Sequence, residues 1–214
     1  IWGKSKNTIV SNCIFTGNPL YGIGVQVNNA DTILMSDTKF SDFSRNIDVS
    51  STQTFSNQRN VNNLSIKDCV FWGGLTPGFN AITGVNDLEF SGNTIENTPS
   101  TGITFRGIRG ATVNDNIFKN IGTSGNVSAT VFNNGNGTDT RASKHITANN
   151  NRLVDDRATK TTFFCIQLAG ATDSCLVMGN DSRGGKSGAI AYTNAGTGTS
   201  IKFKDTYTGE PYNS

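Results

Sequence analysis

Residues 102–120 read GITFRGIRGATVNDNIFKN, and this stretch predicts two short β-strands separated by tight corners. Apolar and polar residues alternate in its first part, so Ile103 and Phe105 are expected to face a common core. The second part leads into Asp115 and Asn116, two residue types that favour turns. Strands this short leave no room for hairpins within the stretch. We therefore expect each strand to pair with the equivalent strand of another repeat.

The same pattern recurs along the chain: apolar, any, apolar, any, a turn residue, then Asn, Cys or Thr, any, and a large apolar residue. Its copies occupy residues 9–15, 34–40, 65–71, 89–95, 112–118, 147–153, 176–182 and 201–207. A further strand signal in the repeats covers residues 22–27, 46–49, 81–85, 102–106, 129–132, 165–168 and 189–192. Stacked repeats of this kind predict a parallel β-helix, an all-β solenoid of about eight coils. We expect one domain over residues 1–214.

Stacking places equivalent residues of successive coils about 4.8 Å apart, so like residues form ladders along the axis. The predicted corner residues are Asn12, Asp37, Asp68, Gly92, Asp115, Asn150, Gly179 and Lys204. The next position holds Cys13, Thr38, Cys69, Asn93, Asn116, Asn151, Asn180 and Asp205. Two positions later stand Phe15, Phe40, Phe71, Ile95, Phe118, Leu153, Ser182 and Tyr207. We expect the asparagine amides to hydrogen-bond along the stack, and the last row to form a hydrophobic column.

Composition limits the partners that the chain can have. Its 27 Asn and 24 Gly residues fit a fold with many corners. Only 16% of the residues are charged and the net charge is +2, which argues against binding of nucleic acid or of an anionic membrane. No apolar run reaches 18 residues, so no membrane insertion is expected. Because Ile1 falls within a repeat, we expect the chain to be a fragment of a larger polypeptide.

Four motifs carry a resemblance to a known superfamily: NTIVSNCIF (7–15), DLEFSGNTIEN (87–97), the stretch quoted first, and HITANNNRLVD (145–155). Through them the chain resembles the pectate-lyase-like right-handed parallel β-helices, and most of all phage tailspike and receptor-binding β-helices. The resemblance implies a homotrimer that recognises, and often degrades, a bacterial surface polysaccharide. It also implies a place on the virion tail, outside the cell; the alternative is a secreted bacterial protein.

Carboxylates are the first candidates for chemistry, because glycoside hydrolysis needs two of them about 5 to 9.5 Å apart. We predict Asp42 and Asp48 as the catalytic pair, since Asp48 projects from a strand face and Asp42 lies just before it. Asp37 and Asp68 share a corner position on consecutive coils, but aspartate favours such corners for structural reasons.

A sugar-binding site is predicted from residues of the fourth and fifth repeats. Glu89, with Asp87 and Glu96, precedes Arg106 and Arg109, although surface ion pairs explain the same residues. Exposed aromatic rings stack on sugars, and the candidates are Trp72, Tyr21, Phe79 and Tyr192. Insertions at residues 50–63 and 133–144 are expected to form walls beside the strand face.

Other motifs point to no chemistry. The acidic residues do not form a cluster fit for a metal, and no cofactor is expected. The run GNDSRGGKSG (179–188) misses the phosphate-loop spacing by one residue and is predicted to be a glycine-rich loop. The single histidine, His145, has no partner that would suggest a metal or triad site, and we assign it no role. The four cysteines are predicted to be free thiols.

Three classes of function remain. We favour a polysaccharide-binding β-helix of a phage receptor-binding protein. A polysaccharide depolymerase, either hydrolase or lyase, is the alternative, because active sites of this superfamily can lie between subunits. A structural stalk is the second alternative, although a stalk would not need two long polar insertions.

Overall fold

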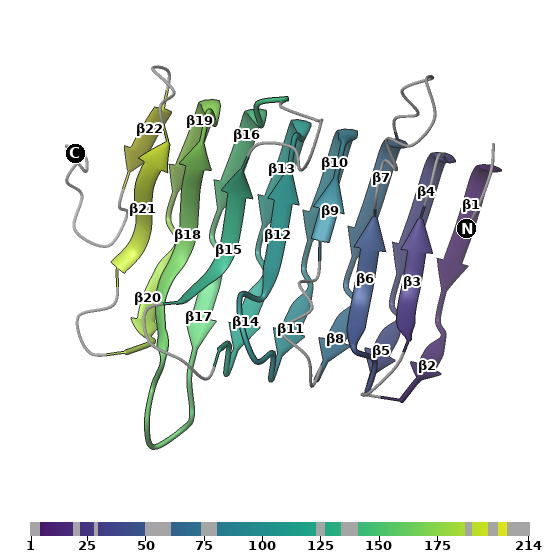
Figure 1. Cartoon of the computed structure of the whole chain (residues 1–214), viewed down its shortest axis with the longest axis horizontal. Helices are drawn as coiled ribbons and strands as arrows, with labels where there is room; N and C mark the ends of the chain where they lie inside the picture. Colours follow the sequence, from purple (N-terminus) through teal and green to yellow (C-terminus); the bar gives the residue numbers. More distant parts are fainter. Residues whose placement is uncertain are drawn as a thin grey trace.

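The computed structural model describes residues 5–18, 22–27, 30–49, 61–73, 81–122, 127–133, 141–186, 190–196 and 201–204. Every regular element in these ranges is a β-strand, and the strands form three parallel sheets (Figure 1). The described residues contain no helix, and so none that is long and apolar enough to cross a membrane.

The sheets are named here A, B and C. Sheet A consists of β1 (Ser5–Ser11), β4 (Ala30–Ser36), β7 (Val61–Lys67), β10 (Val85–Ser91), β13 (Arg109–Asn114), β16 (Lys144–Asn149), β19 (Asp173–Met178) and β22 (Ile201–Lys204). Sheet B consists of β2 (Ile14–Thr16), β5 (Lys39–Ser41), β8 (Val70–Trp72), β11 (Thr94–Glu96), β14 (Ile117–Lys119), β17 (Arg152–Val154) and β20 (Asp181–Gly184). Sheet C consists of β3 (Ile23–Val27), β6 (Arg45–Val49), β9 (Ala81–Thr83), β12 (Ile103–Arg106), β15 (Val127–Asn133), β18 (Thr162–Gly170) and β21 (Ile190–Gly196).

Each strand pairs in parallel with the strand three elements later, which is the equivalent strand of the next coil. Phe105 in sheet C, for example, lies opposite Phe132, and Ile95 in sheet B lies opposite Phe118. One coil therefore visits sheets A, B and C in turn before the next coil begins. The prediction of a parallel β-helix of about eight coils is confirmed.

The corners between sheets A and B lie where the sequence predicted them. Asn12, Asp37, Asp68, Gly92, Asp115, Asn150 and Gly179 all have a positive φ, between 49° and 67°. Asn, Asp and Gly enter this left-handed region more readily than other residues do. The corner amide also links coils, because Asp68 N–H donates to Ser91 O at 3.1 Å and Asp115 N–H donates to Asn149 O at 3.1 Å.

The residues after the corners form the predicted amide ladder. Asn93 N–H donates to Asn116 Oδ1 at 2.9 Å, and Asn116 N–H donates to Asn151 Oδ1 at 3.1 Å. Each side-chain amide nitrogen also reaches back to a strand carbonyl of the preceding coil, as Asn116 Nδ2 does to Phe90 O at 2.9 Å. Asn151 and Asn180 repeat the arrangement. These buried polar groups therefore bond along the axis instead of being left unsatisfied.

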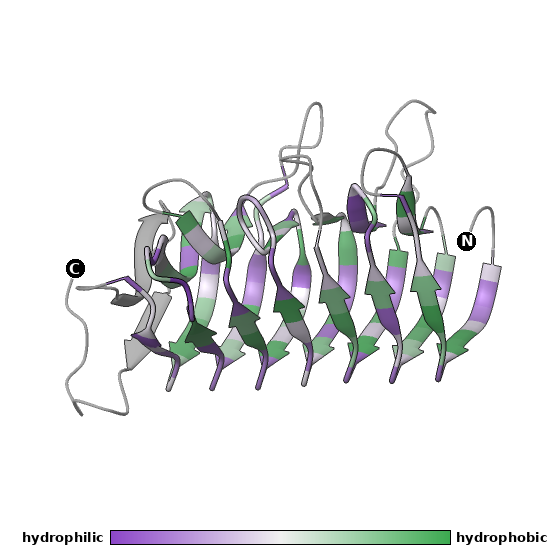
Figure 2. Ribbon diagram, turned by 90° about the horizontal axis from the view of Figure 1, so that it is seen from below, coloured by the Kyte–Doolittle hydropathy of each residue, from purple (hydrophilic) through white to green (hydrophobic). Residues whose placement is uncertain are grey.

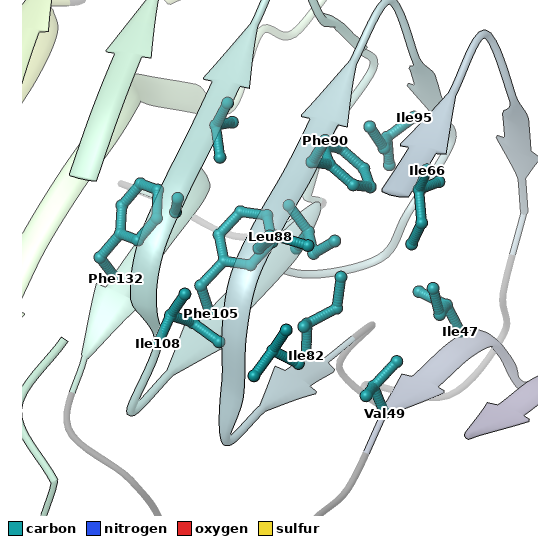
Figure 3. Packing of buried hydrophobic residues seen from close by; sticks show 14 of the residues in the cluster. Ile47, Val49, Ile66, Ile82, Leu88, Phe90, Ile95, Phe105, Ile108 and Phe132 are labelled. Atoms are coloured by element: carbon teal, nitrogen blue, oxygen red, sulfur yellow. The ribbon is translucent and has the colours of Figure 1, made fainter. Parts of the chain in front are cut away.

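The core lies between the three sheets and is built from stacked side chains. The predicted hydrophobic column is buried at Phe40, Phe71, Ile95, Phe118 and Leu153. Rings of adjacent coils lie nearly parallel, with centroids 5.2 Å apart for Phe15 and Phe40 and 5.3 Å apart for Phe40 and Phe71. Figure 3 shows Phe105 and Phe132 of sheet C side by side, with centroids 4.9 Å apart.

Alternation along the strands separates this core from the solvent-facing side chains. Hydrophobic and hydrophilic segments alternate along the stacked coils in Figure 2. Phe15 departs from the predicted column in being 38% exposed. Its strand, β2, is the edge strand of sheet B, so no side chain of a further described coil covers its outer ring face.

Two loop predictions need correction. The run at residues 179–188 is not all loop, because Asp181–Gly184 forms β20 and pairs with β17. The insertions are also shorter than predicted, since residues 61–63 belong to β7, and Asn133 and Lys144 belong to β15 and β16. Lys204, predicted as a corner, instead ends β22 and pairs with Met178, the residue before the corner Gly179. Residues 50–60 and 134–140, where walls were expected, lie outside the described residues. The four cysteines are free.

Candidate functional site

A second column of left-handed residues crosses sheet A. The register places Asn7, Thr32, Asn63, Asp87, Gly110, His145 and Ser174 opposite one another on successive coils, and each has a positive φ. In β10, for instance, Asn86 and Leu88 pair with Arg109 and Ala111 of β13, so that Asp87 and Gly110 stand between the pairs. Each of these coils therefore has one left-handed residue at the same position along sheet A.

A shallow depression of about 410 Å³ opens beside this column on the outer face of β10, β13 and β16. These strands are neighbours in the sheet (Figure 1). The depression is lined by Asp87, Leu88 and Glu89 of β10, Gly110, Ala111 and Thr112 of β13, and His145 and Thr147 of β16. Glu89, Thr112 and Thr147 occupy one register row, and Asp87, Gly110 and His145 occupy the left-handed column. Two polar rows therefore border the hollow.

Gly110 accounts for the place of the hollow. Its φ is +73°, and a Cβ atom there would lie 2.9 Å from Asp87 Oδ1. The Asp87 carboxylate thus leans over the space where the other coils carry a side chain. His145, which is exposed, borders the same space from the following coil.

The two carboxylates of the depression differ in their surroundings. Glu89 Oε1 forms an ion pair with Lys67 Nζ at 2.7 Å, and Ser65 Oγ donates to Glu89 Oε2 at 3.2 Å. Asp87 has no ion-pair partner within the described part of the chain. The site therefore presents one neutralised carboxylate, one uncompensated carboxylate, two threonine hydroxyls and an imidazole. These groups donate and accept hydrogen bonds, as recognition of a hydroxylated ligand requires.

The structure separates the residues predicted to form one sugar site. Glu89 and Arg109 lie on sheet A, but Arg106 ends β12 in sheet C. Arg109 is exposed and precedes Gly110 without lining the depression. Glu96 lies on sheet B, where Lys119 Nζ bridges it to Asp156 at 3.4 and 3.2 Å. The hydrogen bond that Lys119 Nζ donates to Asp156, together with the charge of Glu96, raises the pKa of Lys119.

The predicted catalytic pair is divided between a corner and a strand. Asp42 follows sheet B in a left-handed conformation, with φ 60°, and its N–H donates to Trp72 O at 3.3 Å. Asp48 lies on β6 in sheet C and forms an ion pair with Arg45 at 3.2 Å, its side chain being 15% exposed. The surroundings of both residues account for them structurally, and their catalytic role stays a prediction.

Of the predicted aromatic platforms, the structure describes Trp72. It ends β8 on the outer face of sheet B and is 38% exposed, beside Glu96 of the next coil in the register. Trp72 therefore faces solvent on a different sheet from the depression. Tyr21, Phe79 and the side chain of Tyr192 lie outside the described residues.

Sequence reasoning missed His145 and Gly110. His145 was given no role because the chain has no second histidine, but the register brings it within two coils of Asp87. The spacing itself held the signal: Asp87, Gly110 and His145 each stand two positions before an outward residue of the aligned repeats. Thr32 and Ser174, however, are not residues from which a left-handed conformation would be expected.

A metal site has no support in the described residues. They contain no group of three or more His, Cys, Asp or Glu side chains arranged to hold a metal ion. Asp155 is buried and forms an ion pair with Arg157 at 2.8 Å.

A solenoid of parallel coils with three sheets and asparagine ladders is a β-helix. The chain belongs to the right-handed β-helix family, whose model, described as "Right handed beta helix region", matches residues 1–144. No curated protein matches the chain significantly.

Two solved structures are similar, both of PfbA, described as a surface adhesin of Streptococcus pneumoniae. One is 10% identical over 93% of this chain and 67% of the PfbA chain, with a TM-score of 0.41. The other is 12% identical over 98% of this chain and 65% of its own, with a TM-score of 0.40. The chain spans about two thirds of the length of these proteins.

Proposed function

We propose that this β-helix is a receptor-binding module of the phage-tailspike type that recognises a bacterial surface polysaccharide through the outer face of sheet A. The observation that carries the proposal is the depression over β10, β13 and β16, whose open border holds Asp87, Glu89, Thr112, His145 and Thr147. A long polymer needs an open, rigid surface with repeated hydrogen-bonding groups. Paired parallel strands hold these groups at fixed spacing, which lowers the entropy cost of binding.

The weak overall charge agrees with such a partner. With a net charge of +2, the chain lacks the electrostatic attraction on which binding to nucleic acid depends. Hydroxyl, carboxylate and imidazole groups on an open face instead suit a ligand rich in hydroxyls. Assembly as a homotrimer and a place on the virion tail, outside the cell, belong to the same proposal.

Binding is tested by titrating the protein with a panel of purified capsular polysaccharides, O-antigens and teichoic acids, with calorimetric detection. We expect at least one polysaccharide to bind. The double variant Thr112→Ala/Thr147→Ala should weaken that binding, because both hydroxyls border the depression. The matched control, Thr16→Ala/Thr94→Ala, removes two hydroxyls from strands of sheet B and should leave affinity unchanged. Equal losses in both variants would contradict the proposal.

A second function, depolymerisation of the same polysaccharide, is favoured by the presence of two carboxylates, Asp87 and Glu89, on one strand at the depression. Hydrolysis requires such a pair, one acting as acid and the other as nucleophile or base. A reducing-end assay with the bound polysaccharide tests it: release of ends by the parent protein, lost in Asp87→Asn and Glu89→Gln, would establish an enzyme. Asp42→Asn and Asp48→Asn, assayed alongside, test the pair predicted from sequence.

A further inference from the structure

The left-handed column of sheet A is interrupted at one point. Among the seven described coils in which the column is seen, six positions carry a side chain and Gly110 carries none. The gap lies between Asp87 on the coil before it and His145 on the coil after it. The backbones of those two coils are about 9.6 Å apart, which is twice the strand spacing. The Asp87 carboxylate fills part of this gap, since its Oδ1 would lie 2.9 Å from a Cβ at residue 110, and the open depression extends from there to His145.

The groups around the gap are complementary in their hydrogen bonding. Asp87 Oδ1 leans over Gly110 and accepts hydrogen bonds only. The imidazole of His145 presents two ring nitrogens that can take part in hydrogen bonds on the opposite side. Leu88 and Ala111 supply apolar contacts within the depression, since both are among its lining residues. The gap thus has the hydrogen-bond acceptor Asp87 at one border, the imidazole of His145 at the other, and apolar side chains between them.

The charges around the gap also select among ligands. Lys67 neutralises Glu89, whereas Asp87 has no cationic partner among the described residues. A ligand group carrying a carboxylate or phosphate would be repelled by Asp87 at short range. A hydroxylated, uncharged unit would instead donate to it.

We propose that the Gly110 gap is the specificity subsite of the polysaccharide surface, which admits one uncharged sugar unit that donates hydroxyls to Asp87 and contacts His145. The inference rests on the proposed function and names the part of the polysaccharide that is read. Gly110 contributes by lacking a side chain, which leaves the depression open.

The test fills the gap and displaces the Asp87 carboxylate, because a Cβ at residue 110 would lie 2.9 Å from Asp87 Oδ1. Asn occupies the same column at Asn7 and Asn63 with φ near 50°, so Gly110→Asn should keep the left-handed conformation. The polysaccharide retained from the panel should bind this variant at least about tenfold more weakly, a loss typical of a blocked or unpaired contact. Thr32→Asn places the same side chain three coils away in the column, where a side chain already stands, and should keep the parent affinity. Circular dichroism and thermal melting of both variants report whether they fold.

His145 provides a second readout because it is the chain's single histidine. Its imidazole Hε1 proton gives one resolvable NMR signal, which should shift when the polysaccharide is added to the parent protein and stay in place with Gly110→Asn. Parent binding with an unmoved His145 signal, or an unchanged affinity of Gly110→Asn, would overturn the subsite alone. Failure of the parent to bind any member of the panel would overturn the proposed function as well. Tighter binding of teichoic acids, whose backbones carry phosphates, than of neutral O-antigens would overturn the charge selection.

Discussion

At the position after the corner, the earlier and the later coils use different side chains to bond the same backbone N–H groups. In the later coils Asn93, Asn116, Asn151 and Asn180 each accept a backbone N–H from the preceding rung and donate to a strand carbonyl one coil earlier. The described rungs before them carry Cys13, Thr38 and Cys69. There Thr38 Oγ1 accepts from Cys13 N–H at 3.4 Å, and Cys69 Sγ accepts from Thr38 N–H.

The difference lies in the donors. An asparagine amide has two N–H groups and reaches the neighbouring coil, whereas Thr38 Oγ1 and Cys69 Sγ donate to Ser36 O and Lys67 O of their own strands. The amide rungs therefore cross-link three coils, while the hydroxyl and thiol rungs link two. Sulfur is also the weaker partner. Cohesion between coils should accordingly be greater from Asn93 onward.

The largest expected effect is the loss of an amide rung. Asn116→Ala removes the acceptor of both Asn93 N–H and Asn93 Nδ2, the donor to Phe90 O and the donor to Asn151 Oδ1, and all of these groups are buried. Unsatisfied buried groups cost about 1–3 kcal/mol each, so we expect a loss of about 4 kcal/mol in the free energy of unfolding. Urea denaturation measures it. Asn86→Ala, which removes an amide bonded to Asn62 on the outer face, should cost far less.

The matched change in the earlier half is Cys69→Ala. It leaves Thr38 N–H without its sulfur acceptor and creates a small void. Because two weak interactions are lost in place of four stronger ones, we expect a loss of about 2 kcal/mol in the same denaturation experiment. A loss equal to that of Asn116→Ala would remove the distinction between the two halves.

Much of this comparison was predictable from sequence. The corner at Asp115 and the amide at Asn116 were identified because turn residues and asparagines recur at fixed offsets from apolar runs. The left-handed conformations of Thr32, His145 and Ser174 were not, since their residue types do not indicate it and only the register of paired strands reveals the column. The candidate site depends on that register and on one missing side chain at Gly110. The spacing of the aligned repeats marks these positions, but it indicates neither their left-handed conformation nor the hollow at Gly110.

The thiol rung at Cys69 should also differ from the amide rungs in its response to alkaline pH, because a thiol titrates and an amide does not. Burial raises the pKa of Cys69 above its ordinary value of 9.0, and burial likewise raises the pKa of Cys175 to about 12. The unfolded chain therefore loses these protons at lower pH than the folded chain, so stability is retained below pH 9 and falls above it.

Denaturation at pH 8 to 10.5 measures this slope. Just above pH 9, each buried thiol contributes a loss that approaches about 1.4 kcal/mol per pH unit. Cys69→Ala should make the decline shallower by up to that amount. An identical decline in the variant and the parent would show that Cys69 does not hold its proton in the folded state.

The smallest expected effect is a gain, and it tests whether the amide is the cause of the difference between the halves. Cys69→Asn places a carboxamide next to Asn93, the first of the amide rungs. Asn93 Nδ2 donates to Ile66 O, and the register pairs Ile66 with Met35, so the new amide nitrogen should reach Met35 O. Its oxygen replaces sulfur as the acceptor for Thr38 N–H. One added net hydrogen bond is worth about 0.5–1.5 kcal/mol, reduced by the fit of a slightly larger side chain, so a stabilisation of about 0.5 kcal/mol is expected.

Cys13→Asn is the matched control: β1 is the edge strand of sheet A, and no described coil precedes it to offer a carbonyl. A higher urea midpoint for Cys69→Asn but not for Cys13→Asn would assign the extra cohesion to the link between coils, whereas equal midpoint changes would assign it to the side chain alone.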